Sequence, residues 1–112
     1  MPLSIVVSKL PAAAMAIYPF ILFKRAAYKN NPVLVNHEKI HLQQQLELLI
    51  LPFYLLYFFH YLFNLAKYKN HQQAYFNIAF EREAYQNECN LGYLKNRKTF
   101  AWVKWLNPKK TV

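Results

Sequence analysis

The chain has 112 residues, which suffices for one domain and leaves no room for separate catalytic and substrate-binding domains. Hydrophobic residues make up 55% of it and aromatic residues 18%, a composition that forms a packed core and excludes a disordered chain. Lys and Arg outnumber Asp and Glu by 14 to 5, which draws the chain toward anionic partners. We therefore predict a single basic domain over residues 1–112.

The basic residues flank the apolar stretches, and no known nucleic-acid-binding module is visible. We expect no nucleic-acid partner, and we expect the charge to serve solubility or contact with an anionic membrane surface. Cys89 is the only cysteine, so the chain has no internal disulfide, which suits a reducing interior or a membrane surface. The N-terminus lacks a basic start and predicts no clear cleavable signal peptide.

The first predicted element is β-structure in residues 15–23, MAIYPFILF, which are β-branched and aromatic. Pro19 cannot donate to a strand ladder, so we expect an edge or bulged strand, or a short hairpin. Residues 24–32, KRAAYKNNP, are polar and end in a turn signal.

Two helical segments follow. Residues 33–51, VLVNHEKIHLQQQLELLIL, are rich in strong helix formers and place apolar side chains on overlapping faces. Pro52 is expected to end or kink this helix, and a second helix then runs to about Tyr68.

The apolar stretch 48–63 is shorter than the roughly twenty residues that a transmembrane helix needs, and Pro52 and His60 interrupt it. Its aromatic residues surround nearly the whole helix. We predict that this helix is central to the core, with a position in a membrane interface as the alternative.

A third helical region is predicted over residues 72–96, with Phe80, Ala84 and Leu91 on its apolar stripe and Gly92 as a break. The tail 99–112 is expected to pack Trp102, Trp105 and Leu106 against the body. The predicted fold class is α+β and mostly helical: a short N-terminal strand or hairpin and three helices.

The sequence His37-Glu38-Lys39-Ile40-His41 matches H-E-x-x-H and lies inside the first predicted helix. Two histidines four residues apart point the same way, so their ring nitrogens can converge on one ion. A zinc ion there would lower the pKa of a bound water to about 7, and Glu38 is placed to take its proton. The motif therefore predicts a Zn²⁺ site with His37 and His41 as ligands and Glu38 as the catalytic carboxylate.

A catalytic zinc needs a third protein ligand. The chain has no Asp, and its remaining candidates are Glu47, Glu81, Glu83, Glu88, His60 and His71. Glu47 is too close along the same helix, and lone histidines such as His60 and His71 are more often packed or interfacial residues. The glutamates of the third helical region are better placed, and these residues alone leave the choice among them open.

The H-E-x-x-H motif, followed about forty residues later by FEREAY at residues 80–85, resembles the gluzincins, whose third ligand is a glutamate on a later helix. NHEKIHLQQQLELL followed by FEREAY is similar to small bacterial zincin-like proteins of the kind found in Bacteroidetes. In the related membrane-bound peptidases, a glutamate three residues before an alanine binds the metal, which implies Glu81 here, with Glu83 as the alternative. The resemblance implies a minimal zincin-like domain in a bacterium, cytoplasmic or membrane-associated.

Two further residues are candidates for supporting roles. Tyr85 stands where those peptidases usually have Asp and lies four residues after Glu81, where its hydroxyl could orient a ligand or stabilise an oxyanion. Gln44 lies on the same face as both histidines and could hydrogen-bond to a ligand, or it is a solvated helix residue. The resemblance also suggests that residues 16–23 align the substrate as an added strand.

The predicted function is hydrolysis of a peptide or protein substrate by a zinc metallopeptidase, with a partner chain completing the cleft as one option because the domain is small. Two alternatives remain: a zinc-binding relic without catalysis, and a membrane-associated helical interaction protein.

Overall fold

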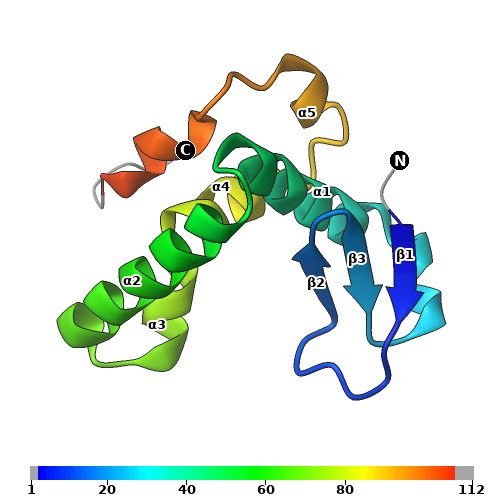
Figure 1. The fold of residues 1–112 in the computed structure, drawn as a ribbon, viewed down its shortest axis with the longest axis horizontal. Helices are drawn as coiled ribbons and strands as arrows, with labels where there is room; N and C mark the ends of the chain where they lie inside the picture. Colours follow the sequence, from blue (N-terminus) through cyan, green and yellow to red (C-terminus); the bar gives the residue numbers. More distant parts are fainter. Residues whose placement is uncertain (1–2, 108–112) are drawn as a thin grey trace.

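A three-stranded sheet and a series of helices make up the computed structural model, which describes residues 3–107 (Figure 1). The α+β, mostly helical fold class is confirmed. The strands are β1 (Leu3–Val6), β2 (Ala14–Ile17) and β3 (Phe20–Phe23). The helices are the 3₁₀ helix η1 (Ala26–Asn30), α1 (Pro32–Glu47), α2 (Leu51–Tyr68), α3 (His71–Phe76), α4 (Ala79–Asn87), α5 (Tyr93–Asn96) and the 3₁₀ helix η2 (Ala101–Leu106).

The predicted hairpin is present as β2 and β3, which pair antiparallel. Pro19 lies in the turn between them and interrupts neither strand. For this reason the expectation of an edge strand fails for β3, which is the central strand: β1 pairs parallel to its other side, in the order β1-β3-β2. The sequence pattern did not predict β1, a short strand whose four residues are all exposed.

Helix α1 begins at a cap and ends at a tight turn. The Asn31 side chain accepts hydrogen bonds from the Val33 and Leu34 amides at 3.1 and 3.2 Å. The helix ends at Glu47, earlier than predicted, because the chain turns by 112° into α2 through Leu49 and Ile50, both with positive φ. Pro52 occupies the first turn of α2, where its missing amide costs nothing.

The third predicted helix is wrong as a single element. The chain breaks after Phe76 and again after Asn87, giving α3, α4 and α5. Leu91 was expected on an apolar stripe but lies between helices and is 59% exposed. The break before α4 places Glu81 in the first turn of that helix, facing α1.

Two small hydrophobic clusters stabilise the fold. One packs the sheet on α1 through Ala14, Ile21, Phe23 and Leu42. The other joins α2, α4 and η2 through Phe53, Ile78, Ala79, Phe80, Trp102 and Trp105. The tail packs through both tryptophans as predicted, but Leu106 is 49% exposed, and residues 108–112 of the predicted tail lie outside the described residues.

Helix α2 is not the central core helix that the sequence predicted. Of its residues, only Phe53 and Asn64 are buried. Helix α2 packs beside α3 and projects away from the sheet (Figure 1), so one side of it has no protein neighbour among the described residues.

A buried group of three charges ties the C-terminal segment to α1 and α4. The Arg97 guanidinium contacts the carboxylates of Glu47 and Glu83, and these three side chains are at most 4% exposed. The Tyr93 hydroxyl donates to Glu83 at 2.6 Å, and the Phe100 amide donates to Glu47 at 2.9 Å. Every charge in this group is therefore paired within the protein.

We predict that Arg97→Ala lowers the free energy of unfolding by about 3 kcal/mol or more, because it leaves two carboxylates buried without a counter-charge. Urea denaturation followed by circular dichroism measures the change. Lys95→Ala, at an exposed position two residues earlier, is the matched control and should shift stability by no more than about 0.5 kcal/mol. Equal effects of the two changes would contradict this account of the ion group.

Candidate metal centre

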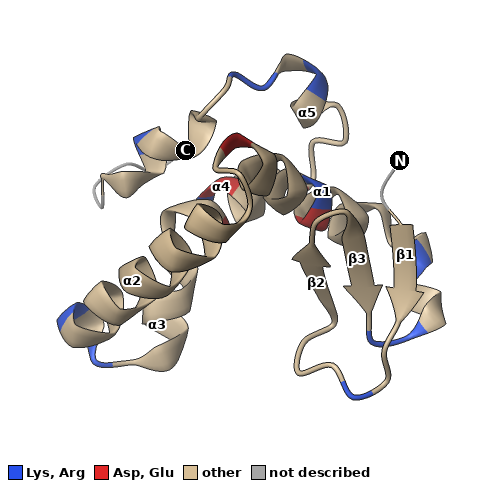
Figure 2. Ribbon diagram, in the orientation of Figure 1, with Lys and Arg blue, Asp and Glu red and all other residues tan. Residues whose placement is uncertain are grey.

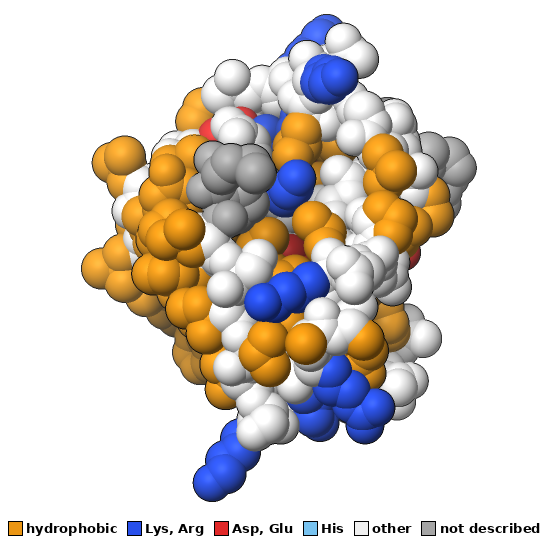
Figure 3. All heavy atoms as spheres, turned by 90° about the vertical axis from the view of Figure 1, so that its right-hand side faces the viewer, with side chains coloured by type: hydrophobic (Ala, Val, Ile, Leu, Met, Phe, Trp, Pro, Cys, Tyr) orange, Lys and Arg blue, Asp and Glu red, His pale blue; other side chains and the backbone are white. Residues whose placement is uncertain are grey.

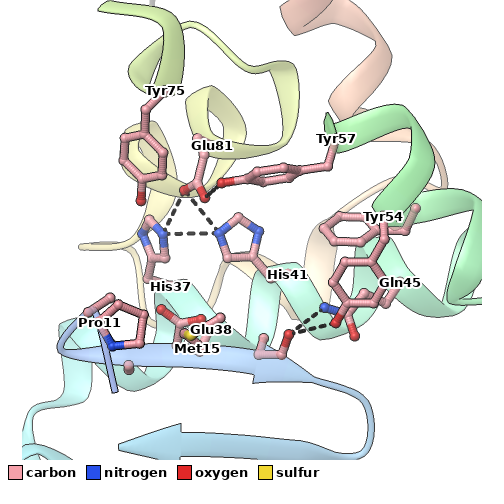
Figure 4. Close-up of a pocket in the computed structure, with 14 residues that line it drawn as sticks. Pro11, Met15, His37, Glu38, His41, Gln45, Tyr54, Tyr57, Tyr75 and Glu81 are labelled. Atoms are coloured by element: carbon pink, nitrogen blue, oxygen red, sulfur yellow. Dashed lines mark hydrogen bonds and ion pairs between the residues drawn. The ribbon is translucent and has the colours of Figure 1, made fainter. Parts of the chain in front are cut away.

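Three ligand atoms from two helices meet in the interior. His37 and His41 on α1 and Glu81 on α4 are all buried (Figure 4). The two Nε2 atoms lie 3.1 Å apart, and Glu81 Oε1 lies 3.2 Å from the first and 3.0 Å from the second. Tetrahedral ligands about 2.1 Å from a zinc ion are about 3.4 Å from one another, so this triangle could hold a metal ion after small shifts.

The approach of α4 to α1 is fixed by a residue next to the motif. Asn36 is buried, and the two hydrogens of its side-chain amide are shared among the carbonyls of Asn87, Glu88 and Asn90, at 3.3, 2.8 and 3.0 Å from Nδ2. These carbonyls lie at and just beyond the C-terminal end of α4, and those of Asn87 and Asn90 also accept the backbone amides of Asn90 and Tyr93, at 3.1 and 3.0 Å. Asn36 therefore anchors the C-terminal end of α4 against α1.

Each histidine is oriented through its other ring nitrogen. His37 Nδ1 donates to Glu88 Oε1 at 2.8 Å, and His41 Nδ1 donates to Gln44 Oε1 at 2.8 Å. The Gln44 amide nitrogen donates to Glu83 at 2.9 Å and to the Phe80 carbonyl at 3.1 Å, which leaves its oxygen for His41. With a proton fixed on each Nδ1, both Nε2 lone pairs face Glu81.

The third ligand is oriented in a similar way. The Tyr57 hydroxyl on α2 donates to Glu81 Oε2 at 2.6 Å, which leaves Oε1 for the two histidines. Three acceptor atoms then face one another in a buried space. They repel unless a proton or a cation lies among them, so the arrangement itself favours a positively charged occupant.

The pKa values of His41 and Glu81 also indicate that the group favours a positive charge. Burial alone would lower the pKa of His41, but the Glu81 carboxylate raises it to about 9. Burial would raise the pKa of Glu81, but His41 and His37 lower it below its usual range. Without a metal, therefore, a proton on His41 neutralises Glu81.

Glu38 differs from Glu81 in that no described residue forms an ion pair or hydrogen bond with its carboxyl group. Its carboxyl is buried, which raises its pKa, and among the described residues none donates a hydrogen bond to it. It lines a cavity of about 340 Å³ beside the ligand group. Figure 4 shows it between the histidines and strand β2. A carboxylate so placed is able to exchange a proton with a molecule in the cavity.

The cavity lies between the two hydrophobic clusters. Its walls come from β2 and the segment before it, from α1, α2 and α3, and from Glu81 of α4. They are Pro11, Ala12, Ala14, Met15, Ala16, His37, Glu38, His41, Gln45, Phe53, Tyr54, Tyr57, Tyr75 and Glu81. The walls are mainly apolar apart from the metal-ligand group, Glu38, Gln45 and the tyrosine hydroxyls, as in many small-molecule and peptide sites.

The other candidates for the third ligand lie elsewhere. Glu47 and Glu83 are bound to Arg97, and Glu88 holds the far side of His37. The His60 ring accepts the Ala79 amide hydrogen at 3.1 Å, and His71 is hydrogen-bonded to Tyr61 at 2.8 Å. Among the described residues, only Glu81 joins both histidines within one group of candidate ligands.

Tyr85 lies beside the metal-ligand group rather than on the cavity wall. Its ring packs edge-on against His37 with centroids 4.5 Å apart, and its hydroxyl is 3.0 Å from that of Tyr75, which does line the cavity. The catalytic role of Tyr85 stays a prediction. Gln44 is fully buried, so the alternative of a solvated helix residue is wrong.

Sequence reasoning considered Glu88 only as a possible third ligand and missed its role as the partner of His37, and it missed Tyr57 and Tyr75 as parts of this centre. Glu88 lies seven residues after Glu81, about two helical turns, so helical spacing could have placed it on the same face. For Tyr57 and Tyr75 no local pattern was available, because their positions depend on how α2 and α3 pack.

Comparison of the chain with protein-family models, with curated proteins and with solved structures finds no match. The observations that bear on its function are those of the motif and of the metal-ligand group.

We predict that metal binding releases a proton and tightens as pH rises. The pKa of His41 is about 9 without metal, so below pH 9 an ion must displace that proton, and its apparent affinity should rise about tenfold per pH unit between pH 6 and 8. Titration calorimetry with Co²⁺ or Zn²⁺, in two buffers of different ionisation enthalpy, measures the proton count. Affinity independent of pH, without proton release, would show that His41 is unprotonated in the free protein.

Proposed function

We propose that this chain is a zinc-dependent, gluzincin-like metallopeptidase, with zinc held by His37, His41 and Glu81. The supporting observation is the triangle of three buried acceptor atoms, with both histidine Nδ1 atoms already bound to oxygen. Two imidazoles and one carboxylate are the donor set of catalytic zinc peptidases, in which the fourth position is left for water or substrate. The cavity beside the group supplies space for that position.

Zinc, when bound, would polarise a peptide carbonyl and acidify a water molecule. Glu38 would take the proton of that water and deliver it to the departing amine nitrogen. Burial raises the pKa of Glu38, which favours its taking up the proton of that water. No hydrogen bond from the described residues competes for this carboxylate.

Tyr75 and Tyr85 would act as a pair. The Tyr75 hydroxyl lies at the cavity wall and could donate to the oxygen of the attacked carbonyl. Tyr85 is hydrogen-bonded to that hydroxyl and packs on His37, so its role would be to hold the Tyr75 hydroxyl in place.

The substrate would lie along β2. Ala14, Met15 and Ala16 line the cavity, and β2 is an edge strand of the sheet, so an extended peptide could pair with its backbone. The Ala16 carbonyl already accepts hydrogen bonds from Gln45 at 2.8 Å and Tyr54 at 3.0 Å. The peptide would therefore pair nearer Ala14.

We predict that Glu38→Gln retains one zinc per chain but lowers peptide hydrolysis at least about 100-fold, because the proton carrier is lost while the ligands remain. His37→Ala should lose both zinc and hydrolysis. Metal analysis of the purified proteins and mass spectrometry of a diverse pool of unstructured peptides measure the two properties.

Lys39→Gln is the matched control for this experiment, since it changes a neighbouring charge on α1 outside the cavity wall. It should keep both zinc and activity. Stoichiometric zinc in the wild-type chain without cleavage of any peptide would replace the peptidase with a non-catalytic zinc site.

A further inference from the structure

Helix α2 exposes apolar side chains and turns its polar side chains inward, the opposite of an ordinary surface helix. From Leu51 to Ala66, every exposed side chain is apolar. These residues, here called the α2 outer face, are Leu51, Pro52, Leu55, Leu56, Phe58, Phe59, Leu62, Phe63 and Ala66. Phe59 and Phe63 are 61% and 64% exposed. Their spacing of three and four residues places them on one side of the helix.

The hydrogen-bonding side chains of the same segment all point into the protein. Tyr54 donates to the Ala16 carbonyl, Tyr57 to Glu81, and Asn64 to the Ala74 carbonyl at 3.1 Å. Tyr61 and His60 are hydrogen-bonded to His71 and to the Ala79 amide. In residues 51–66, therefore, the polar side chains face the interior of the protein and the hydrocarbon side chains face outward.

An apolar surface of this kind indicates a binding partner that shields it from water. Apolar side chains exposed together in water are unfavourable, and contiguous patches of this kind mark interaction sites. Figure 3 shows hydrophobic side chains gathered along one edge of the molecule. Protein interfaces are rich in aromatic residues, Met and Arg and contain many polar atoms, whereas the α2 outer face has aromatic residues but no polar side-chain atom. Its chemistry is that of a surface that meets lipid chains.

Charge supports the same occupant. All five acidic residues of the chain belong to the metal centre or to the Arg97 ion group: Glu38, Glu47, Glu81, Glu83 and Glu88. The most exposed of them, Glu88, has a side chain that is only 25% exposed. The outer surface consequently carries almost only positive charge, including the exposed Lys67 and Lys69 at the end of α2 (Figure 2).

We propose that the α2 outer face lies in the surface of an anionic lipid bilayer, parallel to the membrane plane. Leu51 to Phe63 would extend for about 20 Å along the apolar boundary. Lys67 and Lys69 would contact the phosphate headgroups. This arrangement needs no spanning helix; within residues 3–107, none is long and apolar enough to cross a membrane alone, although the bent pair α1 and α2 together meets a criterion of length and composition.

Vesicle flotation with the full chain tests this proposal. The wild-type protein should float with vesicles of mixed phosphatidylcholine and phosphatidylglycerol, and less with phosphatidylcholine alone. Leu55→Ser/Phe59→Ser/Phe63→Ser should lower the partition coefficient at least about tenfold, because three side chains no longer favour the lipid. The matched control Leu3→Ser/Leu91→Ser/Val103→Ser removes three exposed apolar side chains elsewhere and should float like the wild type.

A second measurement applies if the triple variant does not fold, as judged by circular dichroism. A polarity-sensitive fluorophore on Phe59→Cys, in a Cys89→Ser background, should shift to the blue with anionic vesicles, whereas one on Leu91→Cys should not. Wild-type protein that stays out of the lipid fraction, or equal effects of the two triple variants, would overturn the proposal. So would dimerisation through this face without vesicle binding, which would identify a second copy as the occupant.

Discussion

The geometry of the metal-ligand group depends on two protons, those on Nδ1 of His37 and of His41. Glu88 and Gln44 accept them, and as a result both Nε2 lone pairs face the carboxylate of Glu81. The orientation of Gln44 depends in turn on Glu83, and Glu83 is held by Arg97. A chain of hydrogen bonds and ion pairs thus runs from the metal-ligand group to the C-terminal segment, so the stability of the fold and the geometry of the site are coupled.

The same allocation of charge explains the outer surface. The chain has only five acidic residues, and all of them serve the metal centre or the Arg97 ion group. The exterior is left basic. Helix α2 follows the same division, since Tyr54 and Tyr57 donate to strand β2 and to Glu81 while the other side of the helix is hydrocarbon. A peptidase site and a lipid-facing helix would therefore share one element, which would hold the cavity close to a membrane surface.

The sequence predicted what local spacing controls. The first helix follows from its strong helix formers, the convergence of the two histidines follows from their four-residue interval on that helix, and the hairpin follows from β-branched residues on each side of Pro19. Glu81 came from a resemblance, and the structure brings it to both histidines. Strand β1, the exposure of α2 and the role of Tyr57 depend on contacts between distant segments, which no window of residues contains. Pro52 signalled the end of the first helix, but the backbone geometry of the turn at Leu49 and Ile50 has no local signal, since neither residue favours positive φ.

The most direct test of the metal centre is X-ray absorption spectroscopy of the zinc-loaded wild-type chain and of Glu81→Gln. The account predicts two imidazole nitrogens at about 2.0–2.1 Å and carboxylate oxygen at about 2.0–2.2 Å in the wild type, with one zinc per chain. It also predicts that Glu81→Gln has a changed oxygen shell and much weaker binding. Zinc bound with sulfur from Cys89, or an unchanged spectrum and affinity in Glu81→Gln, would contradict it.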